Sequence, residues 1–255
     1  QVMSTPVVVD LDLDDDPATL HPSIIFNTFH PTGSSYNDPG VLRVIDGGTC
    51  ADQMSAPAVP ITSPASPAVG DIDGDGKPDI VDALDDPNAP GGVVAFSVDR
   101  VNHQLVELWR SADCTGGART PDLTGPGNAW SGPSLVDLDD DGVPEIVYGA
   151  TVYGNDGCIK ANAPFPAYSV GVIPVVADVD EDGKMELVLG DQLLEYDAAH
   201  AQWTPDPSRT PNAQTVPGQV AVADFGDCPI AALGGRDVAE IAVVSSGSVC
   251  VQTVE

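Results

Sequence analysis

The sequence is poor in basic residues: nine Lys and Arg stand against 39 Asp and Glu in 255 residues, which gives a formal net charge of −30. Proteins that bind nucleic acids neutralise phosphates with clustered Lys and Arg. The deficit therefore excludes a nucleic-acid partner and argues against attachment to an anionic membrane surface. No apolar run approaches the ~20 residues that a membrane helix needs, so we expect no membrane insertion.

Histidine and cysteine are also scarce, and their spacing fits no zinc site, because the chain has no C-x-x-C pair and no Cys/His pattern. A G-x-S-x-G nucleophile elbow is absent too, so we assign no catalytic residue. Five cysteines in an acidic chain favour an oxidising compartment with two disulfides and one free thiol; reduced, buried cysteines are the alternative. The sequence does not reveal the connectivity, and the first candidate pair is Cys228 with Cys250, which share a repeat unit.

Helical periodicity is missing as well, since no segment sustains it over the 11 or more residues that a helix requires. Gly and Pro number 26 and 24, which stays below the ~25–30% of the chain that is typical of low-complexity disorder. Many short strands joined by turns account for such a proportion.

The chain does contain an acidic repeat, D-x-D-x-D-G-x-x-[DE], set between apolar residues. Three copies align without gaps: AVGDIDGDGKPDIV from Ala68, SLVDLDDDGVPEIV from Ser134 and VVADVDEDGKMELV from Val175. Two weaker copies begin at Asp10 and Asp224. The first aspartates of the five copies lie 61, 66, 41 and 46 residues apart, a period typical of propeller blades.

Each repeat unit can supply about four short strands rich in Val, Ile and Leu, with the acidic loop between the first two. We therefore predict an all-β fold, a single β-propeller over residues 1–255 made of five blades of four strands. The units span approximately 1–60, 61–127, 128–170, 171–215 and 216–255. The last unit is one strand short, so we expect further blades of the same parent chain to complete a larger ring.

The spacing of the acidic residues predicts calcium sites. Alternate side chains of an extended loop point the same way, so the carboxylates at loop positions 1, 3, 5 and 9 converge, and the glycine at position 6 turns the carbonyl of position 7 inward. These groups supply the six to eight hard oxygens that Ca²⁺ takes. The predicted ligands are Asp71, Asp73, Asp75, Lys77 (carbonyl) and Asp79; Asp137, Asp139, Asp141, Val143 (carbonyl) and Glu145; and Asp178, Asp180, Asp182, Lys184 (carbonyl) and Glu186.

Three other interpretations of the acidic loops are weaker. An EF-hand needs a bidentate Glu at position 12, where this chain has Asp82, Tyr148 and Leu189, and its flanking helices are replaced here by strand-like segments. Magnesium demands stricter octahedral geometry. A merely solvated acidic surface does not explain why the spacing repeats.

The first and last copies depart from the motif. Ser23 stands where the other copies have the acid of position 9, and Gly226 replaces a ligand in the last copy. Their remaining acids extend the number of predicted calcium sites from three to as many as five: Asp10, Asp12 and Asp14 in the first copy, and Asp224 and Glu240 in the last.

At these residues the chain resembles the FG-GAP/VCBS repeat family, the calcium-loop blades of integrin α-subunit propellers and of many bacterial secreted proteins. The resemblance is specific at 71–79, 137–145 and 178–186, while the name-giving Phe-Gly survives only as Phe225-Gly226. It implies a propeller of seven blades, a location outside the cell or at its surface, and a role in adhesion or ligand binding. Five units against seven again indicate an incomplete ring.

Two classes of function follow. In the first, calcium rigidifies the blades and loops on one face hold a protein or glycan ligand; this module is not an enzyme. The alternative is a calcium-dependent carbohydrate-active enzyme, similar to a polysaccharide lyase, or a lectin. A lyase needs an open metal position with a base beside it, whereas the nearby Lys77 and Lys184 sit at the backbone-ligand position, so we favour binding. Trp109, Trp130 and Trp203 could stack on sugars, but packing between blades is the favoured role.

Overall fold

The structure is a computed structural model, and it describes residues 1–14, 16, 18–30, 38–88, 91–124, 131–163, 175–189, 193–205, 219–223, 239–245 and 248–253. The chain divides into two compact units, residues 1–165 and 166–255, which are described separately. Almost every described element is a strand, and the exception is a short 3-10 helix, η1 (Thr115–Gly117). Within these residues there is no helix long and apolar enough to cross a membrane.

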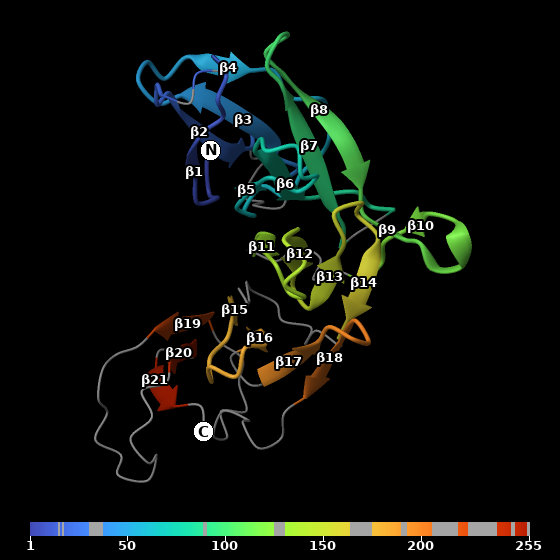
Figure 1. Ribbon diagram of the computed structural model, residues 1–255. Helices are drawn as coiled ribbons and strands as arrows, with labels where there is room; N and C mark the ends of the chain where they lie inside the picture. Colours follow the sequence, from blue (N-terminus) through green and yellow to red (C-terminus); the bar gives the residue numbers. More distant parts are fainter. Residues whose placement is uncertain are drawn as a thin grey trace. The chain divides into compact units, whose positions relative to one another are not determined.

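The first unit contains three antiparallel sheets of four strands each, in which strands consecutive in sequence are neighbours in space (Figure 1). The first sheet comprises β1 (Val7–Asp10), β2 (Pro22–Thr28), β3 (Val41–Asp46) and β4 (Asp52–Met54). The second comprises β5 (Ala68–Gly70), β6 (Asp79–Ala83), β7 (Val93–Asp99) and β8 (Gln104–Arg110). The third comprises β11 (Ser134–Val136), β12 (Glu145–Tyr148), β13 (Thr151–Tyr153) and β14 (Ile159–Asn162).

A two-stranded hairpin, β9 (Ala112–Asp113) with β10 (Thr120–Pro121), lies between the second and third sheets in sequence. The second unit contains a four-stranded sheet of β15 (Val175–Ala177), β16 (Glu186–Val188), β17 (Leu193–Asp197) and β18 (Gln202–Pro205). Its other sheet has three described strands, β19 (Gln219–Ala223), β20 (Glu240–Ser245) and β21 (Ser248–Thr253).

Three strands, β6, β12 and β16, are buried along their whole length. Each is the second strand of its four-stranded sheet. Their sequences are DIVDA, EIVY and ELV, so apolar residues follow one another without polar alternation. A strand covered on both faces has this pattern. Strand β8 (QLVELWR) is instead largely exposed, as expected for the strand at the outer edge of a sheet.

Within each unit, hydrophobic cores lie between consecutive sheets. One core joins the first sheet to the second through residues such as Ile25, Val44, Ile80 and Phe96. The next joins the second sheet to the third, and in the second unit Val188 and Ile241 belong to a core between its two sheets. Four-stranded sheets stacked face to face in sequence order have the arrangement of propeller blades.

Glycine permits two close approaches between the second and third repeat units. A Cβ on Gly132 would lie 1.9 Å from the carbonyl oxygen of Ser66, and one on Gly157 would lie 2.4 Å from the ring of Trp109. The Trp109 indole N–H also donates a hydrogen bond of 2.8 Å to the Asn155 carbonyl. Trp109 therefore packs between blades, as the sequence favours.

Five sheets of three or four described strands follow one another along the chain, and the acidic loops 71–79, 137–145 and 178–186 connect first and second strands as predicted. The number of blades and the bounds of the five units stay predictions. The hairpin β9–β10 was not predicted. That all 255 residues form a single propeller stays a prediction.

One disulfide links Cys114 to Cys158, 44 residues apart in sequence, and it ties the β9–β10 hairpin to the third sheet. The parallel bridge between Ala112 and Cys158 lies beside it. Cys50 is free and exposed. The predicted pair Cys228–Cys250 lies outside the residues whose side chains are described, so it stays a prediction.

Replacing Cys114 and Cys158 by Ser is expected to lower the free energy of unfolding of the first unit by about 2–4 kcal/mol, because the closed loop no longer restricts the unfolded chain. Urea unfolding followed by circular dichroism measures the change. Cys50→Ser is the matched control and should unfold like the wild type. Equal midpoints for the double variant and the wild type would contradict the described pairing.

A buried carboxyl group lies in the core of the first unit. Asp82 on β6 is fully buried, and its Oδ1 accepts hydrogen bonds from the Asn27 side-chain amide (3.1 Å) and from the Ala83 N–H (2.8 Å). Neither Asp82 Oδ2 nor Asn27 Oδ1 has a described hydrogen-bond partner. Burial raises the pKa of Asp82 to about 8, so the folded protein keeps this group protonated at neutral pH.

Asp82→Asn is expected to flatten the pH dependence of stability between about pH 4 and about pH 8. Only the unfolded carboxyl ionises over this range, so the wild type loses about 1 kcal/mol of unfolding free energy per pH unit from this group as pH rises. Urea unfolding at constant calcium and several pH values measures the slope. Asp52→Asn, at an exposed position, controls for the loss of one charge, and parallel curves for wild type and Asp82→Asn would refute the assignment.

Candidate metal centres

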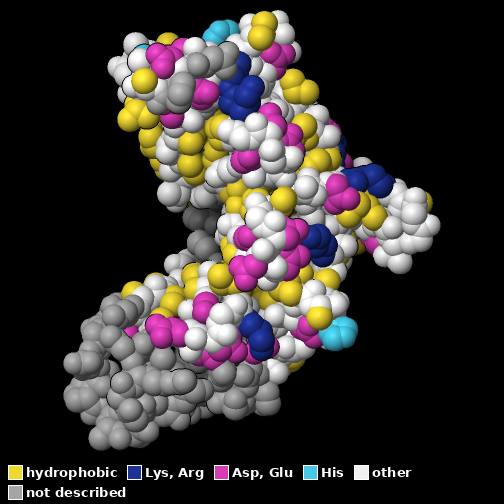
Figure 2. Space-filling model, viewed as in Figure 1, with side chains coloured by type: hydrophobic (Ala, Val, Ile, Leu, Met, Phe, Trp, Pro, Cys, Tyr) yellow, Lys and Arg dark blue, Asp and Glu magenta, His cyan; other side chains and the backbone are white. Residues whose placement is uncertain are grey.

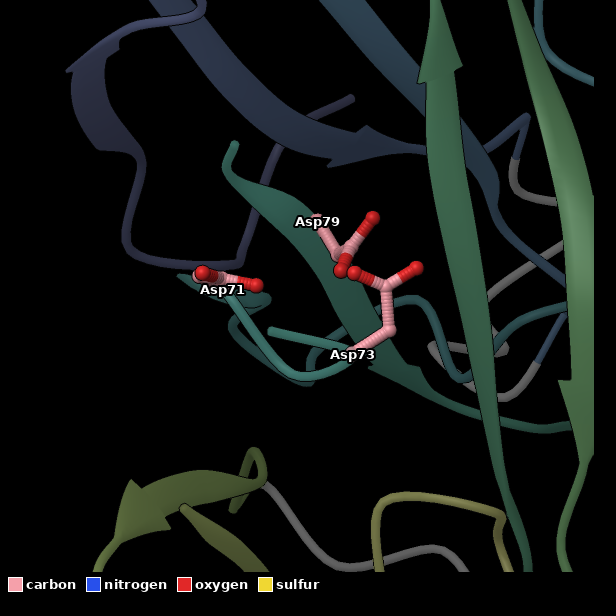
Figure 3. Close-up of side chains that lie close together, drawn as sticks. All are labelled: Asp71, Asp73 and Asp79. Atoms are coloured by element: carbon pink, nitrogen blue, oxygen red, sulfur yellow. The ribbon is translucent and has the colours of Figure 1, made fainter. Parts of the chain in front are cut away.

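Three loops bring acids at different positions of the loop close enough together to surround an ion. In each loop, the acids at positions 1, 3 and 9 offer carboxylate oxygens that all lie within 4.8 Å of one another. The groups are Asp71, Asp73 and Asp79; Asp137, Asp139 and Glu145; and Asp178, Asp180 and Glu186. In Figure 3 the carboxylates of Asp73 and Asp79 face one another, with Asp71 across the loop from them.

Strand pairing places position 9 beside position 1. Asp79, the first residue of β6, pairs with Gly70, the last residue of β5, and Asp71 follows directly. Glu145 pairs with Val136, and Glu186 with Ala177, in the same register. The loop therefore leaves the sheet at position 1 and returns to it at position 9, so both acids stand at one edge of the sheet.

The aspartate at position 1 organises the loop by accepting backbone hydrogen bonds. Asp71 Oδ1 accepts from the N–H of Gly74 (2.7 Å) and Asp75 (3.1 Å), and its Oδ2 accepts from Gly76 (2.8 Å). Asp137 and Asp178 receive the corresponding bonds from positions 5 and 6 of their loops. These backbone hydrogen bonds curve the loop around the aspartate of position 1.

Glycine at position 6 has the positive φ that the sequence predicts, with values of 80°, 87° and 89° for Gly76, Gly142 and Gly183. Position 4 is also left-handed, and there Asp140 and Glu181 have φ values of 57° and 60°. A non-glycine residue in this region carries a cost of about 1–2 kcal/mol. The left-handed backbone of position 4 is therefore kept even where the residue is Asp or Glu, which disfavour this conformation.

The predicted ligand at position 5 is held differently from the others. Asp75, Asp141 and Asp182 each accept, through Oδ1, the N–H of position 7 at 2.8–2.9 Å, and they are not members of the close groups. Ligation by these aspartates, and by the position 7 carbonyls of Lys77, Val143 and Lys184, stays a prediction.

The acid at position 9 is buried in all three loops: Asp79, Glu145 and Glu186 are at most 2% exposed. Burial raises the pKa of Asp79 to about 6, and the like charges of Asp73, Asp75 and Asp71 add to the rise. Burial likewise raises the pKa of Glu186 to about 7. A cation beside a carboxylate favours its charged form, so an ion in the loop would lower the pKa values of these two acids.

Glu186 supplies the clearest test of whether a cation fits. Its Oε2 accepts the Val179 N–H at 2.9 Å, but its Oε1 is buried without a described hydrogen-bond partner. A buried, unsatisfied carboxylate oxygen costs several kcal/mol unless something compensates it. Since Glu186 belongs to the group with Asp178 and Asp180, the donor set fits a divalent cation.

Two lysines beside the loops form ion pairs that the sequence did not predict. Lys184 was expected only as a position 7 carbonyl and a nearby base, and Lys160 was not identified at all. Lys160 Nζ on β14 lies 2.6 Å from Glu145 Oε1, and Lys184 Nζ lies 2.6 Å from Glu195 Oε1 on β17. Both contacts join residues 11 or more apart. Only a known strand register could have located Lys160. Figure 2 shows acidic side chains gathered beside β11 and β12, with basic atoms at their edge.

The first copy does not form a comparable group within the described residues. Asp10 accepts the N–H of Asp12 and of His21, and Asp14 accepts the Thr19 hydroxyl and lies 3.4 Å from His21 Nε2. The hydrogen bond from Thr19 lowers the pKa of Asp14. These aspartates are thus satisfied by protein groups.

Ser23 occupies position 9 of the first copy, paired with Val9, as the sequence predicts. In the last copy, Glu240 is buried at the start of β20, and Asp224 lies outside the described residues. Trp203 is buried and meets Tyr196 edge to face, so it belongs to the core. Trp130 also lies outside the described residues.

Residues 63–81, which include the loop of Asp71 to Asp79, match the FG-GAP repeat family model. The chain carries an FG-GAP repeat. The expected family resemblance is confirmed there, and the loops 137–145 and 178–186 repeat the geometry of this FG-GAP segment. No curated protein is similar enough in sequence to count as a relative.

Several solved structures share the fold. The V. cholerae biofilm matrix protein Bap1 matches with a TM-score of 0.64 and 20% identity, over 100% of this chain and 39% of Bap1. The exotype rhamnogalacturonan lyase YesX (TM-score 0.58, 17% identity) and the Bacillus licheniformis rhamnogalacturonan lyase PL11 (0.57, 18%) each match 98% of this chain and 44% of their own. The chain thus spans about two fifths of these proteins, and its fold is of the β-propeller type.

Glu186→Gln is expected to reduce the number of calcium ions bound per chain from three to two, because it removes a buried carboxylate from one group. Equilibrium dialysis of the metal-stripped full chain, with calcium measured by mass spectrometry, gives the stoichiometry. Glu181→Gln removes the same charge from an exposed position of the same loop and should leave three. Equal stoichiometry for wild type and Glu186→Gln would remove Glu186 from the site.

Proposed function

We propose that the chain is a calcium-stabilised ligand-binding module, part of an extracellular β-propeller protein that works in adhesion. The observation that carries the proposal is the threefold recurrence of a close carboxylate group around a buried acid. Three like charges within 4.8 Å repel one another by ~1 kcal/mol per pair even at water-like dielectric. A cation turns this repulsion into a stabilising interaction.

Calcium is the ion we favour because every donor is a hard oxygen, and calcium accepts variable coordination where magnesium demands a strict octahedron. When bound, calcium supplies positive charge that joins the loop to the edge of the sheet. The chain contributes the arrangement: position 1 curves the backbone, position 6 turns it and position 9 is fixed by β-pairing.

An extracellular location is supported by the disulfide between Cys114 and Cys158, since disulfides persist in oxidising compartments. The similarity in fold to a biofilm matrix protein supports adhesion as the role. We infer a protein or glycan ligand held by loops on a blade face.

The lyase alternative has less support. Three structures of rhamnogalacturonan lyases share the fold, but two of the three lysines beside the acid groups are engaged, Lys160 with Glu145 and Lys184 with Glu195. The third, Lys77, is exposed at position 7 of its loop. A lysine held in a charge pair is a poor general base, because the pair favours its protonated form.

Removal of calcium tests the proposal on stability. We expect EDTA to lower the melting temperature of the full chain by several degrees and to increase protease cleavage within the acidic loops, with millimolar calcium restoring both. Magnesium should restore them only at higher concentration. If EDTA changes neither property and the purified protein contains no calcium, the metal role is wrong.

Ligand binding is tested with glycan and matrix-protein arrays, probed by the full chain with calcium and with EDTA. We expect specific binding that depends on calcium. Release of unsaturated uronides from pectic polysaccharides, followed by absorbance, would instead establish the lyase activity and overturn a purely binding role.

A further inference from the structure

The fourth strand of three sheets carries one extra residue, a β-bulge, opposite the third strand. In each of these sheets the register between the third and fourth strands shifts by one residue. The extra residues that the register skips are Gln53 on β4, Leu108 on β8 and Lys160 on β14. Such bulges redirect side chains.

The three bulge residues occupy the same position in their blades. The strand residue opposite the bulge is Ile45, Phe96 or Tyr153, and it pairs in turn with Ile24, Ile80 or Ile146 on the second strand. Each of these isoleucines directly follows position 9 of the acidic loop. The bulge residue therefore lies two strands away from Ser23, Asp79 or Glu145 in every case.

Side chains at the bulge reach position 9. In the first sheet, the Ser23 hydroxyl donates a 2.6 Å hydrogen bond to Gln53 Oε1. In the third sheet, Lys160 Nζ lies 2.6 Å from Glu145 Oε1. Gly154 leaves the path open, since a Cβ there would lie 3.0 Å from Lys160 Cε. Leu108 in the second sheet is apolar and offers no such contact to Asp79.

We propose that the bulge residue sets the calcium affinity of its blade, and that Lys160 makes the loop 137–145 the weakest of the three sites. The inference rests on the proposed calcium function. Both oxygens of Glu145 are engaged, Oε2 by the Leu138 N–H at 2.9 Å and Oε1 by Lys160. An ion at this loop must displace the ammonium group or bind beside its charge.

In the other two loops, no ammonium group is described in contact with the acid of position 9. Lys184 Nζ of the loop 178–186 pairs instead with Glu195 at 2.6 Å and lies 3.6 Å from Asp182. Asp79 has Leu108 at the bulge position. The sheet of Glu186 has no bulge between its third and fourth strands, and the residue paired with Glu186 is another acid, Glu195. Glu186 Oε1 has no described hydrogen-bond partner. The three sites thus differ in the charged groups on the third and fourth strands of their sheets, although their loops are alike.

Hydrogen–deuterium exchange measured by mass spectrometry tests the order of calcium affinities, because the backbone amides of each loop report the occupancy of that loop separately. The metal-stripped full chain is titrated with buffered free calcium from about 10 nM to about 1 mM, the range of protein calcium sites. In the wild type, the midpoint of protection at 137–145 should lie at higher calcium than those at 71–79 and 178–186.

Lys160→Met should lower the midpoint at 137–145 by about fivefold or more, the effect of removing one like charge near the surface. Lys160→Arg keeps the charge and should retain the wild-type midpoint. Leu108→Lys places the charge in the second sheet and should raise the midpoint at 71–79 alone. The other loops of each variant are internal controls of folding.

An unchanged or raised midpoint at 137–145 in Lys160→Met would overturn the inference, and so would a wild type in which this loop binds calcium most tightly. If no loop of the wild type gains protection with calcium, the proposed calcium function itself fails, which is a distinguishable result.

Discussion

Repulsion between carboxylates is the constraint on which the structure of these blades depends. β-Pairing fixes the acid of position 9 at the sheet edge, directly beside the aspartate of position 1. The stronger this pairing, the less the charges can separate. Burial raises the pKa values of Asp79 and Glu186 to about 6 and about 7, so a bound cation would stabilise their charged forms. The backbone amides that donate to the aspartate of position 1 hold the loop in a curve around this position.

The same blade position shows four solutions to one electrostatic problem. The first blade replaces the acid by Ser23 and bonds it to Gln53. The second keeps a buried acid, Asp79, with an apolar bulge residue, and the third neutralises Glu145 with Lys160. The fourth leaves Glu186 Oε1 unsatisfied. A repeat protein can vary the charge of each unit in this way without altering its strand topology.

The sequence predicted what is local or repeated. Spacing alone located the three loops, the turn at Gly76 and the strands on either side, because alternation and glycine act within a few residues. It also identified Ser23 as the departure from the motif. Lys160 could not be found, because a one-residue bulge and the open space at Gly154 decide where its side chain goes. The Cys114–Cys158 disulfide and the buried Asp82 likewise depend on which sheets become neighbours, and this information is not local.

The central claim is that each of the three loops holds a cation between positions 1, 3 and 9. Anomalous diffraction from crystals of the full chain grown with calcium measures this most directly. We expect three peaks, each ~2.3–2.6 Å from carboxylate oxygens of the groups around Asp79, Glu145 and Glu186. Ordered loops without anomalous peaks, at calcium concentrations that saturate the protein in solution, would contradict it.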